Sequence, residues 1–324
     1  MENMLNNLLR HLGIQVKRVK SLTIEKKYYE NVVNGGVQLY QNLLEANQVN
    51  EDILAIVFSK DRPLQLEVFL RSYFYYGKNC SPITVLYKAG NENFGRAYDK
   101  LKIEMAPYDV TFIEEHDFKS QLITCCEKSF AERLVFYTDD GIFLEEFDLN
   151  DCLAYNSKEF IFCLRFGRDL TYSFVLDKDL QLPEMEDTGN NLFIGWKWMS
   201  EELKSDWSYP LSVDGSIFNR KDILAVLNSI DFRNPSTLEA NMQVFSRFFA
   251  CKNGVSYPKS KLVNIPCNLV QTEIKNRSTA IYTTDELLQI WEEGKRIDIA
   301  PFHRMSMKKA IFLKFEFIDV SASA

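Results

Sequence analysis

The sequence predicts an α/β protein with a mostly parallel sheet that is flanked by helices. Short runs of β-branched and aromatic residues predict buried strands at residues 53–58, 83–87, 110–113 and 134–137. Apolar residues at helical spacing lie between them, over residues 63–74, 94–105 and 118–131. Alternation of strands and helices is typical of a parallel sheet, because parallel neighbours need a long crossover connection.

Length and composition narrow the class of protein. The 324 residues suit one large α/β domain with appendages. A formal net charge of -7 argues against a nucleic-acid-binding protein. Seven cysteines without a C-x-x-C spacing are typical of reduced thiols. Because no apolar run approaches the roughly 20 residues of a membrane span and no signal-peptide pattern is present, we expect a cytoplasmic protein.

Residues 1–50 form a predicted N-terminal helical extension. Leucines at helical spacing, followed by basic residues, predict an amphipathic helix over residues 1–20. Such a helix can pack on its own domain, form a homo-oligomer or lie on an anionic membrane surface. The last alternative would place the protein peripherally at the inner face of the membrane. Residues 23–47 predict one or two further helices, interrupted at residues 34–36.

Polar side chains follow three of the predicted strands. The strand at residues 134–137 runs directly into Asp139 and Asp140. A carboxylate at the end of a buried strand needs compensation for its charge, and divalent cations prefer oxygen ligands. The alternative is a solvated Asp-Asp-Gly turn. Residues 59–62 and Lys88 occupy the equivalent places after two other strands. Since ligands bind beyond the carboxyl ends of parallel strands, these groups are expected to converge.

The second half of the chain gives weaker signals. Residues 160–165 and 209–218 predict strands, the latter containing Asp214, and residues 222–227 predict a helix. Residues 234–241 predict a helix start that Ser236 or Thr237 can cap, with Glu239 in its first turn. Residues 284–288 predict another helix start, and the tail at residues 308–320 a strand. The tryptophans of the intervening aromatic region either pack in the core or form a platform for a sugar ring; they are Trp196, Trp198 and Trp207.

The motifs together resemble the GT-A class of nucleotide-sugar-dependent glycosyltransferases, and most specifically the family 2-like bacterial enzymes of surface polysaccharide biosynthesis. The resemblance rests on residues 57–63, residues 137–141, the Asp214-Gly215 pair and residues 234–239. It covers roughly residues 52–271 and is clearest up to residue 148. The metal motif of the family is usually Asp-x-Asp, whereas Thr138 stands at its first position here.

The resemblance implies a division of the chain and roles for its residues. The catalytic domain would span residues 51–275, with a nucleotide-sugar-binding half (51–150) and an acceptor half (151–275), and residues 276–324 would form a C-terminal extension. Mn²⁺ or Mg²⁺ would be held by Asp140, with Asp139 beside it and His303 as a further ligand from the C-terminal part. The catalytic base would be Glu239, with Asp214 as second choice. The donor-binding residues would be Phe58, Ser59, Asp61, Arg62, Lys88 and Asp139.

The resemblance also implies a reaction. A hexosyl group would pass from a nucleotide sugar, such as a UDP- or GDP-sugar, to a glycan or lipid-linked acceptor, with inversion. A nucleotidyltransferase also pairs a metal with nucleotide phosphates, but it usually has a glycine-rich loop after the first strand, which residues 59–62 lack. A non-catalytic scaffold with a decayed site is the other alternative, and Thr138 is the residue that suggests it.

Overall fold

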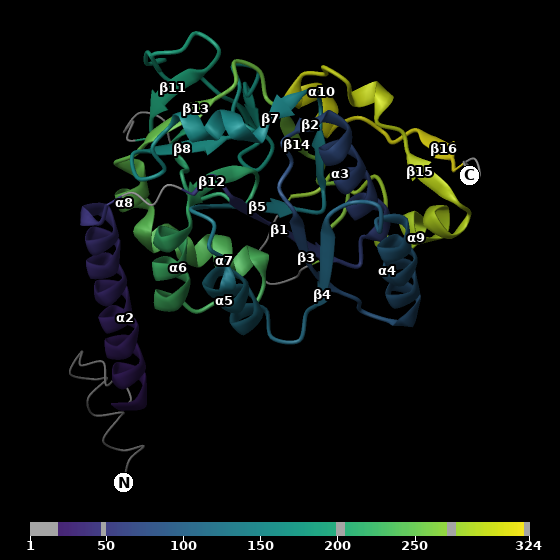
Figure 1. Ribbon diagram of the computed structural model, residues 1–324. Coiled ribbons are helices and arrows are strands. Elements are labelled where there is room, and N and C mark those ends of the chain that lie inside the picture. Colours follow the sequence, from purple (N-terminus) through teal and green to yellow (C-terminus); the bar gives the residue numbers. More distant parts are fainter. Residues whose placement is uncertain (1–18, 47–49, 199–204, 271–276, 321–324) are drawn as a thin grey trace, which may run out of the picture.

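The computed structural model of the protein describes residues 19–46, 50–198, 205–270 and 277–320. At its centre lies an eight-stranded sheet with the order β11-β13-β8-β12-β5-β1-β3-β4, flanked by helices (Figure 1). Its strands are β1 (Ile53–Lys60), β3 (Ile83–Lys88), β4 (Val110–Glu114), β5 (Arg133–Thr138), β8 (Phe160–Cys163), β11 (Ile194–Lys197), β12 (Ser216–Asn219) and β13 (Asn253–Ser256). The predicted α/β fold class is therefore confirmed.

Most neighbours in this sheet run parallel, as predicted. Strand β1 pairs in parallel with both β3 and β5, β3 pairs in parallel with β4, and β13 does so with β8. Strand β12 is antiparallel to β5 and β8, and β11 is antiparallel to β13. The sheet is therefore mixed, with two strands that oppose the others.

Burial on both faces explains the continuous apolar runs of the central strands. Ala55 and Val57 of β1 and Val135 and Phe136 of β5 are completely buried. The crossover helices that cover these strands are α3 (Pro63–Tyr76), α4 (Glu92–Glu104) and α5 (Phe118–Lys128). Local sequence fixes their starts, because α3 has proline in its first turn, and the side chains of Asn91 and Asp117 cap α4 and α5.

The chain reverses its direction of travel across the sheet at β1. From β1 it moves outward to β3 and β4, and then returns to β5 on the other side of β1. Because such crossovers are right-handed, α3 and α4 cover one face and α5 covers the other. Helix α3 accordingly packs with α4, while α5 packs with α6 (Arg220–Ser229). The carboxyl ends of β1 and β5 are therefore the switch point at which ligands bind in sheets of this kind.

The N-terminal helix α2 (Val19–Leu44) is continuous, so the predicted interruption at residues 34–36 is wrong. Its C-terminal half packs on α6, and its other end projects away from the sheet (Figure 1). Gly35 allows this contact, since a Cβ there would lie 2.3 Å from the Ser229 hydroxyl oxygen. Asn42 donates a hydrogen bond to Asp222 on α6 at 3.2 Å. The predicted amphipathic helix at residues 1–20 lies almost entirely outside the described residues.

Shorter elements complete the described structure. The expected strand at 209–218 is much shorter, because residues 211–215 form a loop before β12. The remaining helices are α7 (Pro235–Met242), α8 (Ser246–Ala250), α9 (Thr284–Glu292) and α10 (Met307–Ile311), with 3-10 turns η1 (Leu149–Ala154), η2 (Asp206–Ser208), η3 (Gln243–Phe245) and η4 (Ala300–Phe302). The remaining strands are β2 (Gly77–Lys78), β6 (Gly141–Phe143), β7 (Phe147–Asp148), β9 (Tyr172–Ser173), β10 (Lys178–Asp179), β14 (Leu262–Asn264), β15 (Lys295–Ile297) and β16 (Phe317–Asp319).

The aromatic region of the second half is core. Trp196, Trp198 and Trp207 are at most 1% exposed, and each packs on the ring of Phe166. Since a sugar ring cannot reach a buried indole face, these residues form no stacking platform.

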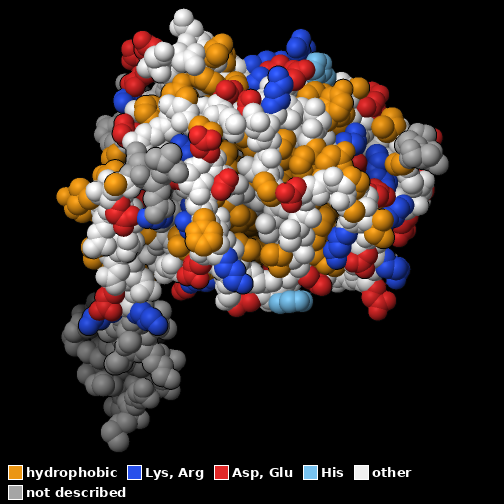
Figure 2. Space-filling model, in the orientation of Figure 1, with side chains coloured by type: hydrophobic (Ala, Val, Ile, Leu, Met, Phe, Trp, Pro, Cys, Tyr) orange, Lys and Arg blue, Asp and Glu red, His pale blue; other side chains and the backbone are white. Residues whose placement is uncertain are grey.

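The surface carries mixed charge. Figure 2 shows acidic and basic side chains interspersed over one face of the molecule. In the described part of the chain, no helix combines the length and the apolar character that crossing a bilayer requires.

Candidate active site

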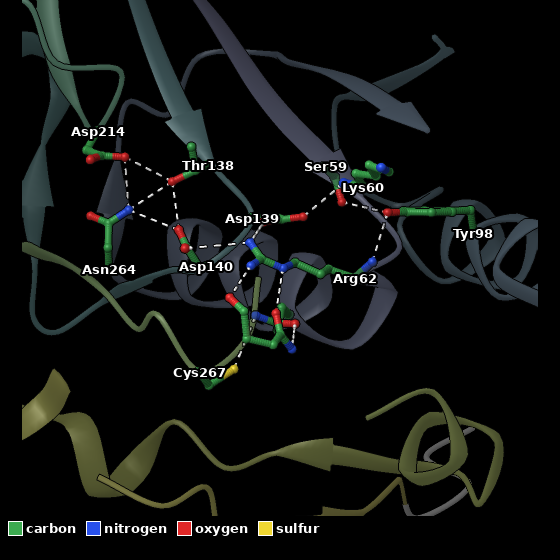
Figure 3. A network of polar contacts seen from close by, with 12 residues as sticks. Ser59, Lys60, Arg62, Tyr98, Thr138, Asp139, Asp140, Asp214, Asn264 and Cys267 are labelled. Atoms are coloured by element: carbon green, nitrogen blue, oxygen red, sulfur yellow. Dashed lines mark hydrogen bonds and ion pairs between the residues drawn. The ribbon is translucent and has the colours of Figure 1, made fainter. Parts of the chain in front are cut away.

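The candidate site lies at the switch point of the sheet. Thr138 is the last residue of β5 and pairs with Phe58 of β1, and the backbone N–H of Asp139 donates to the carbonyl of Phe58 at 3.1 Å. The parallel pairing of the two strands therefore carries the Asp139-Asp140 motif to the carboxyl end of β1. Figure 3 shows the network of polar contacts that surrounds it.

Asp139 is a buried carboxylate held by the loop that follows β1. It is 3% exposed, and its oxygens accept hydrogen bonds from the Lys60 backbone N–H at 3.1 Å and from Arg62 Nη1 at 2.9 Å. Burial raises the pKa of Asp139 to about 6, although the Arg62 guanidinium opposes the rise, and neighbouring Asp140 adds to it.

Arg62 joins this loop to a distant segment of the chain. Its Nε donates to Asn268 Oδ1 at 2.8 Å, and its Nη2 to the Asn268 carbonyl at 2.7 Å. Nη1 lies 3.6 Å from Asp140 in addition to its bond with Asp139. The guanidinium is thus engaged with protein acceptors, and its expected role in donor binding stays a prediction.

The other predicted donor-binding residues lie along the same edge. Asp61 has a left-handed backbone (φ 53°), and its side chain accepts a hydrogen bond from the Gly90 N–H, beyond the end of β3, at 2.5 Å. Ser59 is hydrogen-bonded to Tyr98, and Lys88 forms an ion pair with Glu115. The Phe58 side chain packs on Phe118 and Phe136 in the core, so only its backbone reaches the edge.

Asp140 and Asp214 face each other across two shared donors. The Thr138 hydroxyl lies 2.8 Å from Asp140 Oδ1 and 2.9 Å from Asp214 Oδ1. The Asn264 Nδ2 lies 3.1 Å and 3.0 Å from the same two oxygens. Both carboxylates are partly accessible. Burial, and the neighbouring charge of Asp140, raise the pKa of Asp214 against the opposing effect of Arg165.

Gly215 places Asp214 at this site. Its φ of 75° lies in the left-handed region that favours glycine, and a Cβ there would lie 2.7 Å from the Leu262 side chain. Its N–H donates to the Phe136 carbonyl of β5 at 2.8 Å. The tight loop thereby brings a residue before β12 next to the end of β5.

Glu239 approaches Asp214 from helix α7. The N-cap of this helix is Asn234, whose side chain forms a capping box with Thr237, and no acidic residue lies in its first turn. Glu239 therefore lies beyond the first turn, where the helix dipole explains little. Its carboxylate accepts a hydrogen bond from the Val213 N–H at 3.3 Å. Burial, with a further contribution from Asp214, raises the pKa of the partly accessible Glu239 to about 8.

Two residues of the site were not predicted from the sequence. Arg165 follows β8, and both terminal nitrogens lie 3.3 Å from Asp206. Its position could have marked it, because Arg165, like Asp139 and Asp140, is a charged residue that follows a buried strand. Asn264 ends β14, 124 residues after Asp140, and no local pattern marks it.

His303, the expected further metal ligand, contacts Tyr76 in this structure. Its ring stacks on Tyr76 with the centroids 5.6 Å apart, and the next residue, Arg304, lies 3.6 Å from Glu145. Among the described residues no group of three or more His, Cys, Asp or Glu side chains could hold a metal ion. A role for His303 in metal binding stays a prediction.

The donor set at Asp140 nevertheless fits a hard divalent cation. Asp140, Asp214, Thr138 and Asn264 all carry side-chain oxygens, and Mg²⁺ and Mn²⁺ prefer such ligands. Mg²⁺ sites commonly use few protein ligands and complete their shell with water and phosphate.

Comparisons with known proteins leave the family of this chain open. No protein-family model matches the chain. The bifunctional glycosyltransferase pgtA of Dictyostelium discoideum is 29% identical over 239 residues, which is 68% of this chain and 29% of the relative. The chain thus spans under a third of that relative's length.

Solved structures overlap only partially. Staphylococcus aureus TarS 1–349 is 12% identical and gives a TM-score of 0.39 over 65% of this chain and 59% of that one. The mannosyltransferase PcManGT of Pyrobaculum calidifontis, in complex with GDP-Man and Mn²⁺, is 14% identical and gives 0.28 over 46% of each chain. A nucleotidyl transferase from Methanothermobacter is 11% identical and gives 0.37 over 65% of this chain and 89% of that one. These partial overlaps carry no functional argument.

Proposed function

We propose that this protein is a GT-A-type glycosyltransferase, which moves a sugar from a nucleotide-sugar donor to a hydroxyl acceptor. The observation that carries the proposal is the meeting of Asp140, Asp214 and Glu239 at the switch point of the sheet. A charged phosphate leaving group needs a cation and therefore oxygen ligands that hold it, and a hydroxyl nucleophile needs a carboxylate base close by. Similarity to a bifunctional glycosyltransferase over 239 residues supports it.

The donor would lie along the ends of β1, β3 and β5. Asp61 can accept hydrogen bonds from a base or ribose, and Lys88 can reach a phosphate from the adjoining strand. Asp139 is buried and paired with Arg62, so we assign it to shaping the loop after β1 and to the ribose side of the site. A Mg²⁺ or Mn²⁺ ion held by Asp140 would supply charge neutralisation to the departing diphosphate.

Glu239 is the residue we assign as catalytic base. Its raised pKa makes the ionised carboxylate a stronger base than that of an ordinary glutamate. As the acceptor oxygen bonds to the anomeric carbon, the bond from that carbon to the phosphate oxygen breaks, the electron pair leaves with the diphosphate, and the acceptor proton passes to Glu239. A base that activates the acceptor for direct displacement gives inversion, which is the outcome we propose.

The finer identity of the reaction is also part of the proposal. We propose a hexosyl donor carried on UDP or GDP, and a glycan or lipid-linked acceptor. A role in bacterial surface polysaccharide synthesis follows from the motif resemblance alone, since the similar glycosyltransferase pgtA comes from Dictyostelium. The same holds for a location at the inner face of the membrane and for an oligomer formed through the N-terminal helix.

A donor screen tests the proposal. The protein would be melted with UDP-, GDP-, CMP- and dTDP-sugars, each with and without Mn²⁺, and donor hydrolysis would be measured under the same conditions. We expect one nucleotide class to raise the melting temperature only with Mn²⁺, because a ligand stabilises the state that binds it, and to be hydrolysed slowly. Stabilisation without hydrolysis or transfer in Mn²⁺ would instead indicate a non-catalytic binding protein.

A further inference from the structure

Asp140 and Asp214 lie unusually close for two carboxylates. Asp140 Oδ1 and Asp214 Oδ1 are both within hydrogen-bond distance of the Thr138 hydroxyl, at 2.8 and 2.9 Å. These two oxygens are therefore less than about 6 Å apart, a range in which like charges repel appreciably. Figure 3 shows Thr138 and Asn264 lying beside both carboxylates.

Thr138 and Asn264, the neutral donors between the two carboxylates, have fewer hydrogens than hydrogen-bond contacts. A hydroxyl has one hydrogen and a carboxamide has two. Thr138 contacts both aspartates, and Asn264 Nδ2 contacts both of them as well as the Thr138 hydroxyl, at 2.8 Å. The three hydrogens of these two groups therefore cannot satisfy all five contacts at once. The other end of the same amide, Asn264 Oδ1, is buried and has no hydrogen-bond partner.

The nearby guanidinium groups make their hydrogen bonds with residues other than Asp214. Arg62 bonds to Asp139 and Asn268, and it approaches only the other oxygen of Asp140, at 3.6 Å. Both terminal nitrogens of Arg165 lie against Asp206, and its charge opposes the rise in the pKa of Asp214 only in part. Among the described residues, no ion pair joins a basic side chain to Asp140 Oδ1 or Asp214 Oδ1.

We propose that Asp214 and Asn264 belong with Asp140 to one binding site for a divalent cation of the Mg²⁺ or Mn²⁺ class. This inference rests on the proposed function, and it names the ligands that the motif at the end of β5 lacks. A cation between the two oxygens removes their repulsion. Rotation of the Asn264 amide by half a turn then presents Oδ1 as a ligand, and it ends the isolation of that oxygen.

Asp214 and Glu239, the two candidates for the catalytic base, then have different roles. Asp214 shares its donors with Asp140 and belongs to the cation side of the site, whereas the hydrogen bonds of Glu239 come from the Val213 backbone and the Ser212 side chain. Proton acceptance is therefore left to Glu239. Asn264 takes the place of the ligand from the C-terminal part of the chain, for which His303 was the candidate.

Titration with Mn²⁺ alone tests the assignment, with free Mn²⁺ counted by its electron paramagnetic resonance signal. We expect the wild type to bind one ion, and Asp214→Asn to bind it at least about 10-fold more weakly, the lower end of what even outer-sphere residues contribute. Asn264→Asp adds a charged oxygen ligand and should bind several-fold more tightly. Glu239→Gln should stay within about twofold of the wild type, because Glu239 is assigned no ligand role.

Circular dichroism of each variant controls for folding. If Asp214→Asn is unfolded, Asn264→Asp alone decides: tighter Mn²⁺ binding supports the proposal, and unchanged binding overturns it. Unchanged affinity in a folded Asp214→Asn, or a wild type that binds no Mn²⁺, also overturns it. The titration contains no sugar nucleotide, so it tests the ligand assignment independently of the proposed function. Mn²⁺ binding by these residues, together with no donor hydrolysis in the donor screen, would refute the proposed function and leave the cation site standing.

Discussion

Arg62 and Asp139 form a buried ion pair in which Nη1 lies 2.9 Å from Oδ1 and neither side chain is more than 8% exposed. The same guanidinium bonds to Asn268, so one side chain joins the ends of β1 and β5 to the segment after β14. The pair lies at the switch point, and it therefore couples the stability of the fold to the shape of the site.

Arg62→Met should destabilise the protein by about 3–5 kcal/mol, because it leaves Asp139 buried without its partner. The measurement is the free energy of unfolding in urea. Arg96→Met is the matched control, since Arg96 lies 4.0 Å from Glu92 on an exposed helix face, where such pairs contribute under about 1 kcal/mol. An equal loss of unfolding free energy in the two variants would show that the buried Arg62–Asp139 pair does not stabilise the fold more than an exposed pair does.

Asp140→Asn should remove the Mn²⁺-dependent part of nucleotide binding while leaving the fold intact. The reason is that the amide keeps the shape of the side chain but loses the charge that a cation needs. Calorimetry of UDP and GDP binding, with and without Mn²⁺, measures the effect, and we expect at least about a 10-fold loss of metal-dependent affinity. Asp99→Asn, in an exposed pair with Lys102, is the control. Full metal-dependent affinity in Asp140→Asn would contradict the transferase mechanism.

Glu239→Gln should lower sugar transfer at least about 100-fold without weakening nucleotide binding, because only proton acceptance is lost. Transfer and donor affinity are measured on the same preparation, with the exposed Glu127→Gln as control. Near-normal transfer would rule out Glu239 as the base and favour a retaining mechanism.

The same substitution should change how stability depends on pH. The pKa of Glu239 is raised from its ordinary value of 4.5 to about 8, so the folded protein keeps a proton that the unfolded chain releases. This contribution to stability is complete below pH 4.5 and is lost as the pH rises through 8. Relative to the wild type, Glu239→Gln should gain about 1–2 kcal/mol between pH 5 and pH 8.5, with allowance for partial solvent screening.

Urea unfolding at both pH values measures this difference. Glu127→Gln, at an exposed helix position, should show no such gain. A difference between Glu239→Gln and the wild type that does not vary with pH would mean that Glu239 ionises at its ordinary pKa.

The first half of the fold could be predicted because its signals are local. Strands β1, β3, β4 and β5 are apolar runs buried on both faces, and the caps of their helices lie within a few residues. The edge at which polar residues converge follows from parallel pairing alone. The position of Asp139 and Asp140 beside the end of β1 therefore needed no long-range information.

Other features depend on contacts between distant parts of the chain. Gly35 looked like a helix break, but it allows α2 to approach Ser229 closely. The strand expected at 209–218 begins late, because Gly215 adopts a left-handed turn against Leu262. Asn264 reaches Asp140 and Asp214 only through the pairing of β14 with β6, which no periodicity in the sequence reveals.

His303→Ala distinguishes between the two candidates for the cation ligand from the C-terminal part of the chain. The His303 ring stacks on Tyr76, whereas Asn264 contacts both Asp140 and Asp214. We therefore expect His303→Ala to bind Mn²⁺ within about twofold of the wild type, while Asn264→Ala binds it at least about 10-fold more weakly. The Mn²⁺ titration is repeated with saturating UDP or GDP, since a histidine that closes over a diphosphate would act only in that complex. A loss of Mn²⁺ affinity in His303→Ala, with Asn264→Ala unaffected, would restore His303 as the ligand and remove Asn264 from the site.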